Sequence, residues 1–319
     1  MVTTNKRTDR QNTLLTELRS VYDLTLPELL YRAQGVHRAS HEPEDIQRCA
    51  LLSIKTGGCP EDCGYCAQSA HYETEVPSSD LMTTEDVLAK ARTAKEAGAT
   101  RFCMGTAWRS AKDGKDFDAV LEMVRGVRDL EMEACVTLGM LNEAQARALK
   151  EAGLTDYNHN LDTSREYYPN IVTTRSYDDR LATLDAVEKA GISVCCGGIL
   201  GLGESVEDRL KLLVELRMRE IPPESIPINA LMPMPGTPLE DVPPVDGLDM
   251  VRLIATTRIF FPQARVRLAA GRSRMSRELQ FLCFFAGANS IFFGEKLLTA
   301  PNPETSEDDE LFRSMGLLS

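Results

Sequence analysis

The stretch Leu51–Cys66 reads LLSIKTGGCPEDCGYC and joins a short apolar run to a loop that carries three cysteines. Cys59, Cys63 and Cys66 follow a C-x3-C-x2-C spacing, which would place their thiols on one face of a helix. The glycines and the proline between them disfavour a helix. We therefore expect a strand over LLSIKT, followed by a loop that folds three thiolates toward one point and leaves a fourth ligand position for another group.

Thiolate is a soft ligand that suits zinc or an iron–sulfur cluster. A zinc site completed by His71 would give a Cys3His set, and three reduced cysteines without any metal are the remaining alternative. Paired C-x-x-C knuckles of the zinc type are absent from the sequence, so we favour iron and sulfide.

The loop also resembles the signature of the radical S-adenosylmethionine (SAM) enzymes. In that family three cysteines bind a [4Fe-4S] cluster whose open iron chelates SAM. An aromatic residue usually precedes the third cysteine, and Tyr65 stands at that position.

Size and composition narrow the class of protein. The 319 residues suffice for one large domain or two ordinary ones, and a hydrophobic fraction of 43% can form a sizeable core. A formal charge of −12 disfavours general nucleic-acid binding. The longest uncharged run, Leu279–Gly294, is too short to span a bilayer, and the first residues lack the apolar core of a signal peptide. Nine cysteines without such a signal favour a reducing compartment, so we expect a cytoplasmic protein without a membrane segment.

The chain repeats a strand–loop–helix pattern from Leu51 onward. We expect strands to begin near Leu51, Arg101, Glu133, Asp156, Ser193, Ser225, Arg265 and Ser290. The expected helices are Thr84–Ala97, Asp116–Leu130, Glu143–Ala152, Tyr177–Ala190, Val206–Arg219, Leu248–Phe260 and Arg274–Ala286. About eight such units predict an α/β fold of the (β/α)8 TIM-barrel type, with a last helix after Gly294. A doubly wound sheet is the alternative, but no Gly-x-Gly-x-x-Gly follows the first strand.

This pattern divides the chain into three parts. Residues 1–50 form a helical arm, with helical spacing over Asn12–Tyr22 and Leu26–His37. Residues 51–298 form the barrel, and residues 299–319 form an acidic, Pro-containing tail that we expect to be flexible. The cysteine loop then follows the first strand, at the end of the barrel where such enzymes keep their active sites.

Alternate residues of a barrel strand face the interior, so parity predicts which side chains meet there. Cys103 and Cys135 lie within the second and third strands. In the fifth strand Cys195 shares a face with small residues, and in the seventh Arg267 lies opposite an apolar face. Each cysteine could simply be a small buried hydrophobe, and Arg267 could form an internal salt bridge. Together they can converge on one point inside the barrel.

The fourth strand carries Asn158, Asn160 and Asp162 on one face, and Asn229 has inward parity in the sixth. Such polar groups are costly inside a packed barrel, but they suit the wall of a ligand cavity. A purely structural hydrogen-bond network is the alternative.

With these residues assembled, the sequence resembles the biotin synthase family of radical SAM enzymes. The matching stretches run from about residue 50 to about residue 295 and are SIKTGGCPEDCGYCAQS, RFCMGTAW, CVTLGML, YNHNLDTS, CCGGILGLGE, INALMPMPGTPL and VRLAAGR.

The resemblance implies two cluster sites. The [4Fe-4S] cluster that holds SAM would be bound by Cys59, Cys63 and Cys66. A [2Fe-2S] cluster deeper in the barrel would be bound by Cys103, Cys135, Cys195 and Arg267. A guanidinium is an unusual metal ligand because it is normally protonated. Cys196 makes the choice of Cys195 ambiguous, and Cys49 and Cys283 receive no role.

The resemblance also implies contacts to ligands. SAM would contact Tyr65, Trp108, Asn160, Asp162 and Arg180. The ureido ring of the substrate dethiobiotin would contact Asn158, Asn160 and Asn229.

The implied reaction is the insertion of sulfur into dethiobiotin to form biotin. A flavodoxin-type donor would supply the electron that cleaves SAM to a 5′-deoxyadenosyl radical, this radical would abstract hydrogen from dethiobiotin, and the second cluster would supply the sulfur. The family is homodimeric. The alternatives are a related radical SAM methylase or isomerase without a second cluster, a zinc-stabilised binding protein, and an iron–sulfur redox sensor.

Overall fold

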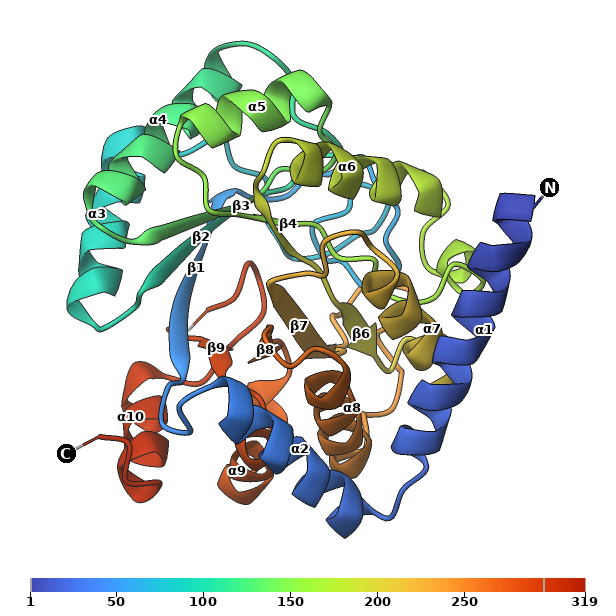
Figure 1. Ribbon diagram of the computed structural model, residues 1–319. Coiled ribbons are helices and arrows are strands. Elements are labelled where there is room, and N and C mark those ends of the chain that lie inside the picture. Colours follow the sequence, from blue (N-terminus) through green and yellow to red (C-terminus); the bar gives the residue numbers. More distant parts are fainter. Residues whose placement is uncertain (1, 295, 319) are drawn as a thin grey trace.

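Parallel strands close into a barrel in the computed structural model, which describes residues 2–294 and 296–318 (Figure 1). The strands run in the order β5-β4-β3-β2-β1-β9-β8-β7-β6, and a further pairing of β5 with β7 closes the ring. They are β1 (Gln47–Lys55), β2 (Arg101–Thr106), β3 (Glu133–Thr137), β4 (Asp156–Asn158), β5 (Ser193–Cys195), β6 (Gly198–Leu200), β7 (Ser225–Ala230), β8 (Arg265–Leu268) and β9 (Ser290–Phe292).

The strand expected from Ser193 is present as two pieces. β5 and β6 occupy one position in the ring, separated by Cys196 and Gly197. At this break a Cβ on Gly197 would lie 1.9 Å from the carbonyl oxygen of Pro227 in β7, so only glycine allows the close approach. The nine strand segments therefore fill eight barrel positions, and the predicted (β/α)8 fold is confirmed.

Helices cover the outside of the barrel close to their predicted positions. They are α3 (Thr84–Glu96), α4 (Lys115–Asp129), α5 (Glu143–Glu151), α6 (Tyr177–Lys189), α7 (Val206–Arg217), α8 (Gly247–Phe260) and α9 (Arg277–Phe285), with short 3-10 helices η1 (Tyr168–Asn170) and η2 (Arg272–Arg274). Capping boxes begin three of them, and the N-cap residues are Asn142, Ser176 and Ser205. Their apolar faces pack on the outer face of the strands and form the main hydrophobic core.

The N-terminal arm forms two helices that lie against the barrel helices. α1 (Val2–Tyr22) runs along α7, and α2 (Leu26–Ser40) lies against α8 (Figure 1). Leu18 and Leu29 are fully buried at these contacts. Arg252 of α8 donates a hydrogen bond to the carbonyl oxygen of Leu24 at 2.7 Å and so holds the turn between the two helices.

β1 begins at Gln47, four residues before the expected start, so the boundary drawn at residue 50 falls inside this strand. Gln47 and Arg48 hide the strand from a hydropathy pattern because they are polar. Inside the barrel, the Gln47 amide donates to Glu133 Oε2 at 2.9 Å. The Arg48 guanidinium lies over the Phe312 ring, 4.9 Å from its centroid. The earlier start brings Cys49 into the barrel wall.

The acidic tail is folded in the described residues, so the prediction that it is flexible is wrong. Helix α10 (Thr305–Ser314) packs against the barrel and buries Phe312. Asp308 of this helix is 1% exposed and pairs with Arg272 of η2, which compensates its buried charge. The acidic composition of this segment predicts disorder. Composition alone does not reveal that one of its carboxylates, that of Asp308, has a buried partner in Arg272.

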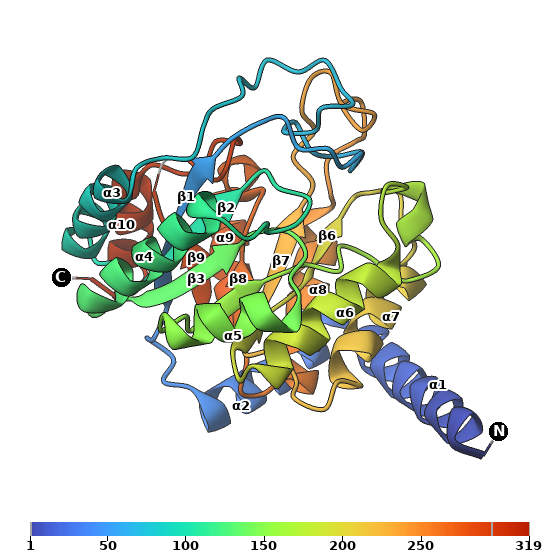
Figure 2. The same ribbon diagram turned by 90° about the horizontal axis from the view of Figure 1, so that it is seen from above.

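The loops at the carboxyl ends of the strands gather on one side of the molecule. Figure 2 shows the long loop after β1 rising beside the loop between β7 and α8. The two loops meet closely, since a Cβ on Gly236 would lie 2.0 Å from the carbonyl oxygen of Glu73. Within the described residues, no helix is both long enough and apolar enough to span a bilayer.

The break between β5 and β6 gives a test of the fold. Gly197→Ala should lower the free energy of unfolding by roughly 1–3 kcal/mol or more, because its Cβ meets backbone that has little room to move. Gly35→Ala, at an exposed helical site with no atom within 4 Å of the new Cβ, should raise it by about 0.5–1 kcal/mol. Urea unfolding measures both, and equal midpoints for the two variants would contradict the packing described at this break.

Candidate functional site

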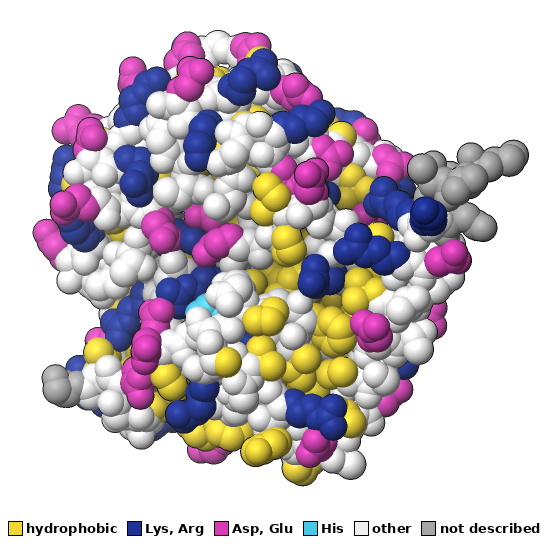
Figure 3. All heavy atoms as spheres, in the orientation of Figure 1, with side chains coloured by type: hydrophobic (Ala, Val, Ile, Leu, Met, Phe, Trp, Pro, Cys, Tyr) yellow, Lys and Arg dark blue, Asp and Glu magenta, His cyan; other side chains and the backbone are white. Residues whose placement is uncertain are grey.

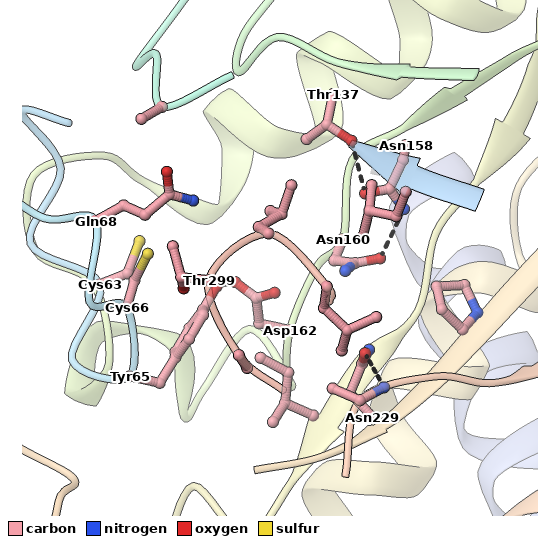
Figure 4. Close-up of a pocket in the computed structure, with 18 of the residues that line it drawn as sticks. Cys63, Tyr65, Cys66, Gln68, Thr137, Asn158, Asn160, Asp162, Asn229 and Thr299 are labelled. Atoms are coloured by element: carbon pink, nitrogen blue, oxygen red, sulfur yellow. Dashed lines mark hydrogen bonds between the residues drawn. The ribbon is translucent and has the colours of Figure 1, made fainter. Parts of the chain in front are cut away.

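A cavity of about 320 Å³ opens at the carboxyl ends of the strands and reaches down into the barrel. The loop cysteines Cys59, Cys63 and Cys66 line its outer part, and Cys103, Cys135 and Arg267 line its deep part. Polar residues of the β3–β4 region line the wall between them (Figure 4). The two predicted thiol groups therefore share one cavity at different depths.

The cysteine loop is folded back on itself by backbone hydrogen bonds. The Cys59 amide donates to the carbonyl oxygen of Gln68 at 2.9 Å, and the Ala70 amide returns a bond to Cys59 at 2.7 Å. Gly57 has φ +69°, and a Cβ there would lie 2.8 Å from the carbonyl oxygen of Pro77. The loop is therefore not helical, as predicted, and Figure 4 shows Cys63 and Cys66 side by side facing the cavity.

The thiols of this loop are protonated when nothing is bound to them. Burial raises the pKa of Cys63 to about 11 and that of Cys66 to about 12. Arg175 Nη2 lies 3.9 Å from Cys63 Sγ and favours the thiolate, but less strongly than burial disfavours it. Binding of a metal cluster here would therefore release protons.

The zinc alternative receives no support from His71. Its ring nitrogen Nε2 lies 3.1 Å from the carbonyl oxygen of Pro60, so the imidazole is engaged with the loop backbone. Within residues 2–294 and 296–318, no three His, Cys, Asp or Glu side chains are arranged to hold a single metal ion.

A buried ion pair lies beside the loop. Asp162 accepts hydrogen bonds from Arg180 Nη2 at 2.6 Å and from the Tyr65 hydroxyl at 3.0 Å. Burial alone would lower the pKa of Arg180, but the carboxylate of Asp162 outweighs it and raises that pKa, so the guanidinium stays charged. Asp162 has φ +67°, a conformation that asparagine and aspartate tolerate better than most residues. Tyr65, Asp162 and Arg180 thus form one fixed polar group. The fourth strand was expected to extend to Asp162, but β4 ends at Asn158, so Asp162 lines the cavity from the segment that follows the strand.

The asparagines predicted to line the cavity do so, and each is held by hydrogen bonds (Figure 4). Asn158 accepts from the Thr137 hydroxyl at 3.1 Å and donates to Asn160 Oδ1 at 3.2 Å. Asn229 donates to the carbonyl oxygen of Gly198 at 3.0 Å and accepts from the amide of Ala270 at 3.2 Å. This asparagine part of the wall is therefore uncharged, rich in donors and acceptors, and fixed before any ligand arrives.

The three predicted deep thiols come together. Cys135 interacts with the thiols of both Cys103 and Cys195, and all three are buried. The hydrogen bond from Cys135, with help from the nearby Arg267, lowers the pKa of Cys195 to about 5. Arg267 Nη1 lies 3.6 Å from Cys195 Sγ. The structure therefore brings these four residues together inside the barrel, as strand parity predicts.

Cys196 and Cys283 lie elsewhere, in the outer hydrophobic core. Both are fully buried, and burial raises the pKa of each thiol. This removes the ambiguity between Cys195 and Cys196, since only Cys195 faces the barrel interior.

A layer of charged side chains closes the barrel below these thiols. Arg101 and Asp156, 1% and 2% exposed, pair at 3.1 Å. Glu133 and Glu224 approach the same guanidinium at 2.6 Å and 3.2 Å. These side chains form a charged network at the deep end of the barrel, in which Arg101 Nη1 and Asp156 Oδ1 have no hydrogen-bond partner among the described residues.

Several lining residues escaped the sequence-based prediction. Leu297, Leu298, Thr299 and Ala300 line the mouth, although they were placed at the end of the barrel or in the tail. A Cβ on Gly105 would lie 2.6 Å from Leu298 Cδ2, so this leucine enters the barrel above Cys103. Trp108 lines the cavity as expected, and Cys49 lies beside Arg267. In the sequence, Gly105 is the one signal that another side chain, here Leu298, packs against the second strand.

Two family models match the chain. The model of the radical SAM superfamily matches residues 53–216, and that of the biotin and thiamin synthesis associated domain matches residues 227–318. A biotin synthase of Methylobacterium sp. (strain 4-46) is 61% identical over 99% of this chain and 96% of its own length. A biotin synthase of Gloeobacter violaceus is 59% identical over 95% of each chain.

Solved structures agree on the fold. The crystal structure of methylornithine synthase (PylB) has a TM-score of 0.80 at 18% identity and covers 97% of this chain and 96% of its own. HydG, a maturase of the [FeFe]-hydrogenase, has a TM-score of 0.79 at 17% identity and covers 98% of this chain and 74% of its own.

The buried pair beside the loop gives a second test. Arg180→Leu should lower the free energy of unfolding by about 3–5 kcal/mol, because it leaves the Asp162 carboxylate buried and unpaired. Adding Asp162→Asn, which keeps an acceptor for Tyr65 and tolerates the positive φ, should recover part of this loss. Urea unfolding of the parent protein, Arg180→Leu and the double variant measures these changes in the free energy of unfolding.

The exposed pair between Lys189 and Glu143, 2.8 Å apart, provides the control. Lys189→Leu should leave the unfolding midpoint unchanged within error. A double variant that is no more stable than Arg180→Leu alone would show that the unpaired Asp162 carboxylate does not cause the loss of stability.

Proposed function

This chain belongs to the biotin synthase family of the radical SAM superfamily, and we propose that it inserts sulfur into dethiobiotin to form biotin. The observation that carries this proposal is the shared cavity. It brings three loop cysteines, a polar wall and two of the deep cysteines, Cys103 and Cys135, onto one path into the barrel. The third deep cysteine, Cys195, interacts with Cys135. A substrate held against that wall would lie between the two thiol groups.

Cys59, Cys63 and Cys66 would hold the [4Fe-4S] cluster to which SAM binds. Three thiols leave one iron free for a further ligand. When bound, this cluster supplies the electron that cleaves SAM, and a [2Fe-2S] cluster deeper in the barrel supplies the sulfur. The chain's own part is to bind, to orient and to exclude water.

The proposed SAM contacts surround the loop. SAM carries hydroxyl groups, an amino-acid group and an adenine ring. The Asp162 carboxylate and the Asn160 amide offer acceptors for hydroxyl groups, while Tyr65 and Trp108 offer apolar and aromatic surface. Arg180 holds Asp162 in place at 2.6 Å. These contacts would fix the bond that breaks relative to the substrate.

Cys103, Cys135, Cys195 and Arg267 would hold the [2Fe-2S] cluster. The thiols are soft ligands suited to iron, and their convergence in a closed, buried space fits a cluster that must survive until it reacts. The side chain of Arg267 is fully buried next to Cys195, so it is placed to be the fourth ligand.

The ureido ring of dethiobiotin has one acceptor oxygen and two N–H donors and carries no charge. Asn158, Asn160 and Asn229 provide amide groups of matching polarity on the cavity wall. Because their hydrogen bonds already fix them, little order is lost when the ring binds. Leu297–Ala300 cover the mouth above and would keep water from a reactive radical.

We propose that a flavodoxin-type electron donor docks beside the cysteine loop. A surface pocket there adjoins Gly58 and Pro60 and is lined by four basic and two acidic side chains, which are Lys55, Arg109, Lys112, Lys115, Asp113 and Asp116. This basic rim contrasts with the overall charge of −12 and suits an acidic partner. All nine cysteines are free thiols, which supports the proposal of a cytoplasmic, reducing location.

We also propose a homodimer that forms through α2 and α9. Tyr31, Phe281 and Phe285 are 76%, 48% and 43% exposed on these helices. The Gln34 amide of α2 donates to the carbonyl oxygen of Phe285, which joins the two helices into one surface. Figure 3 shows apolar side chains over this lower part of the molecule. Large exposed aromatic side chains of this kind usually mark an interface.

The two cluster sites predict separable spectra. Protein prepared without oxygen should show [4Fe-4S] and [2Fe-2S] signatures by Mössbauer spectroscopy, together with matching iron and sulfide contents. Cys195→Ser should lose the second signature and biotin formation while keeping SAM cleavage, because only the deep ligand set changes. Cys63→Ser should lose the first signature and SAM cleavage.

Cys196→Ser is the matched control and should keep both signatures. A single [4Fe-4S] signature in the parent protein, in Cys195→Ser and in Cys196→Ser, even after reconstitution, would instead favour a related radical SAM enzyme without a second cluster. Zinc in place of iron would contradict both the proposed two-cluster enzyme and the one-cluster alternative.

The dimer predicts a change in sedimentation. Phe281→Asp with Phe285→Asp should convert the chain to a monomer, because two desolvated aromatic side chains become charged. Ile221→Asp, at an apolar residue that is 61% exposed outside these helices, should stay dimeric. A parent protein that sediments as a monomer would refute the interface.

A further inference from the structure

Cys49 faces the same interior space as the deep thiols. It lies in β1, where it pairs in register with Phe292 of β9, and it is fully buried. It packs in one cluster with Cys103 and Cys135, next to Leu51 and Phe292. Four cysteines from four different strands therefore meet inside the barrel, and Cys49 is the one that has no part in the proposed function.

The guanidinium of Arg267 lies between two of these thiols. Its Nη2 donates to Cys49 Sγ at 3.2 Å, and its Nη1 lies 3.6 Å from Cys195 Sγ. Its Nε donates to Ser290 Oγ at 2.9 Å, and its plane lies over Phe292, 4.9 Å from the ring centroid. Arg267 thus occupies the space through which Cys49 would approach a group held by the other three thiols.

The hydrogen-bond partners of the Cys49 thiol do not depend on it. This thiol lies 3.6 Å from Ser290 Oγ and 3.4 Å from Gln47 Oε1, both neutral groups that can bond to one another, since Ser290 donates to Gln47 at 3.2 Å. Withdrawal of the Cys49 thiol would therefore not leave these two groups without partners.

The chemistry of the fourth position favours a thiolate. Iron in a [2Fe-2S] cluster is commonly held by four cysteine thiolates, whereas a guanidinium is protonated and has no free lone pair under ordinary conditions. Of the two side chains that lie beside the three thiols, Cys49 is thus the better ligand for iron.

We propose that Cys49 is a reserve ligand of the second cluster, which completes a four-cysteine set with Cys103, Cys135 and Cys195 when Arg267 is removed or withdraws. This inference rests on the proposed [2Fe-2S] site. The chain would then hold the cluster in two ways, one with the arginine and one with four thiolates.

The test isolates the second cluster in the full-length chain. Alanine at Cys59, Cys63 and Cys66 removes the first cluster site, and this background is reconstituted with iron and sulfide without oxygen. Arg267→Leu is then compared in this background with Arg267→Leu/Cys49→Ala. Iron and sulfide content, visible circular dichroism, and the electron paramagnetic resonance of the reduced cluster are measured, together with the rate of iron loss to a chelator.

Arg267→Leu should retain one [2Fe-2S] cluster per chain with spectra shifted toward those of an all-cysteine cluster. Adding Cys49→Ala should abolish the shifted spectrum and speed the loss of iron at least about tenfold, as expected when a ligand shell is incomplete. Arg267→Leu/Cys283→Ala, which removes a buried cysteine from the outer core, should behave as Arg267→Leu does.

Equal spectra and iron-loss rates with and without Cys49 would overturn the proposal, and so would an Arg267→Leu chain that folds but holds no cluster. A background protein that still carries Arg267 but binds no [2Fe-2S] cluster would refute the second-cluster site itself, and the inference with it. If Arg267→Leu does not fold, Arg267→Gln, whose amide can still bond to Ser290, permits the same comparison.

Discussion

The alternation of inward and outward residues in a closed parallel barrel is the constraint on which this structure depends. Every second residue of each strand must face a space of fixed width. In most barrels that space is packed with branched apolar side chains. Here it holds an ion-pair layer around Arg101 and Asp156, then thiols, then amides. The apolar core lies outside the strands, so stability and chemistry use opposite faces of the same strands.

The ion-pair layer shows how the barrel can leave its upper part open. Arg101 reaches three carboxylates, so a buried charge at the base is compensated without apolar packing. Such a pair adds little net stability, because desolvation offsets most of the attraction. Its value is geometric. It places charged side chains at the base of the barrel, below the thiols, and the cavity lies above them.

Parity could predict the site wherever a strand was recognised. Cys103, Cys135 and Cys195 meet as their strand positions predict. Of the polar wall, only Asn158 lies within β4, and Asn160 and Asp162 line the cavity from the segment after it, where strand alternation no longer applies. Cys49 was missed because Gln47 and Arg48 conceal the start of β1. Their burial depends on partners from β3 and α10, far away in the sequence. Hydropathy reports a side chain's preference for water and cannot report a partner that only the folded chain provides.

The mouth of the cavity also depends on contacts between residues that are far apart in the sequence. Asn302 donates to the carbonyl oxygens of Gly294 at 2.7 Å and Phe292 at 3.0 Å, and this draws the segment before it over the barrel. Arg272, just after β8, binds the carboxylate of Asp308 and so fixes helix α10 to the same edge. The position of Leu298 above the thiols thus depends on residues that never touch a ligand. A tail that composition predicts to be flexible is, in this fold, folded against the barrel, and its first residues line the mouth of the cavity.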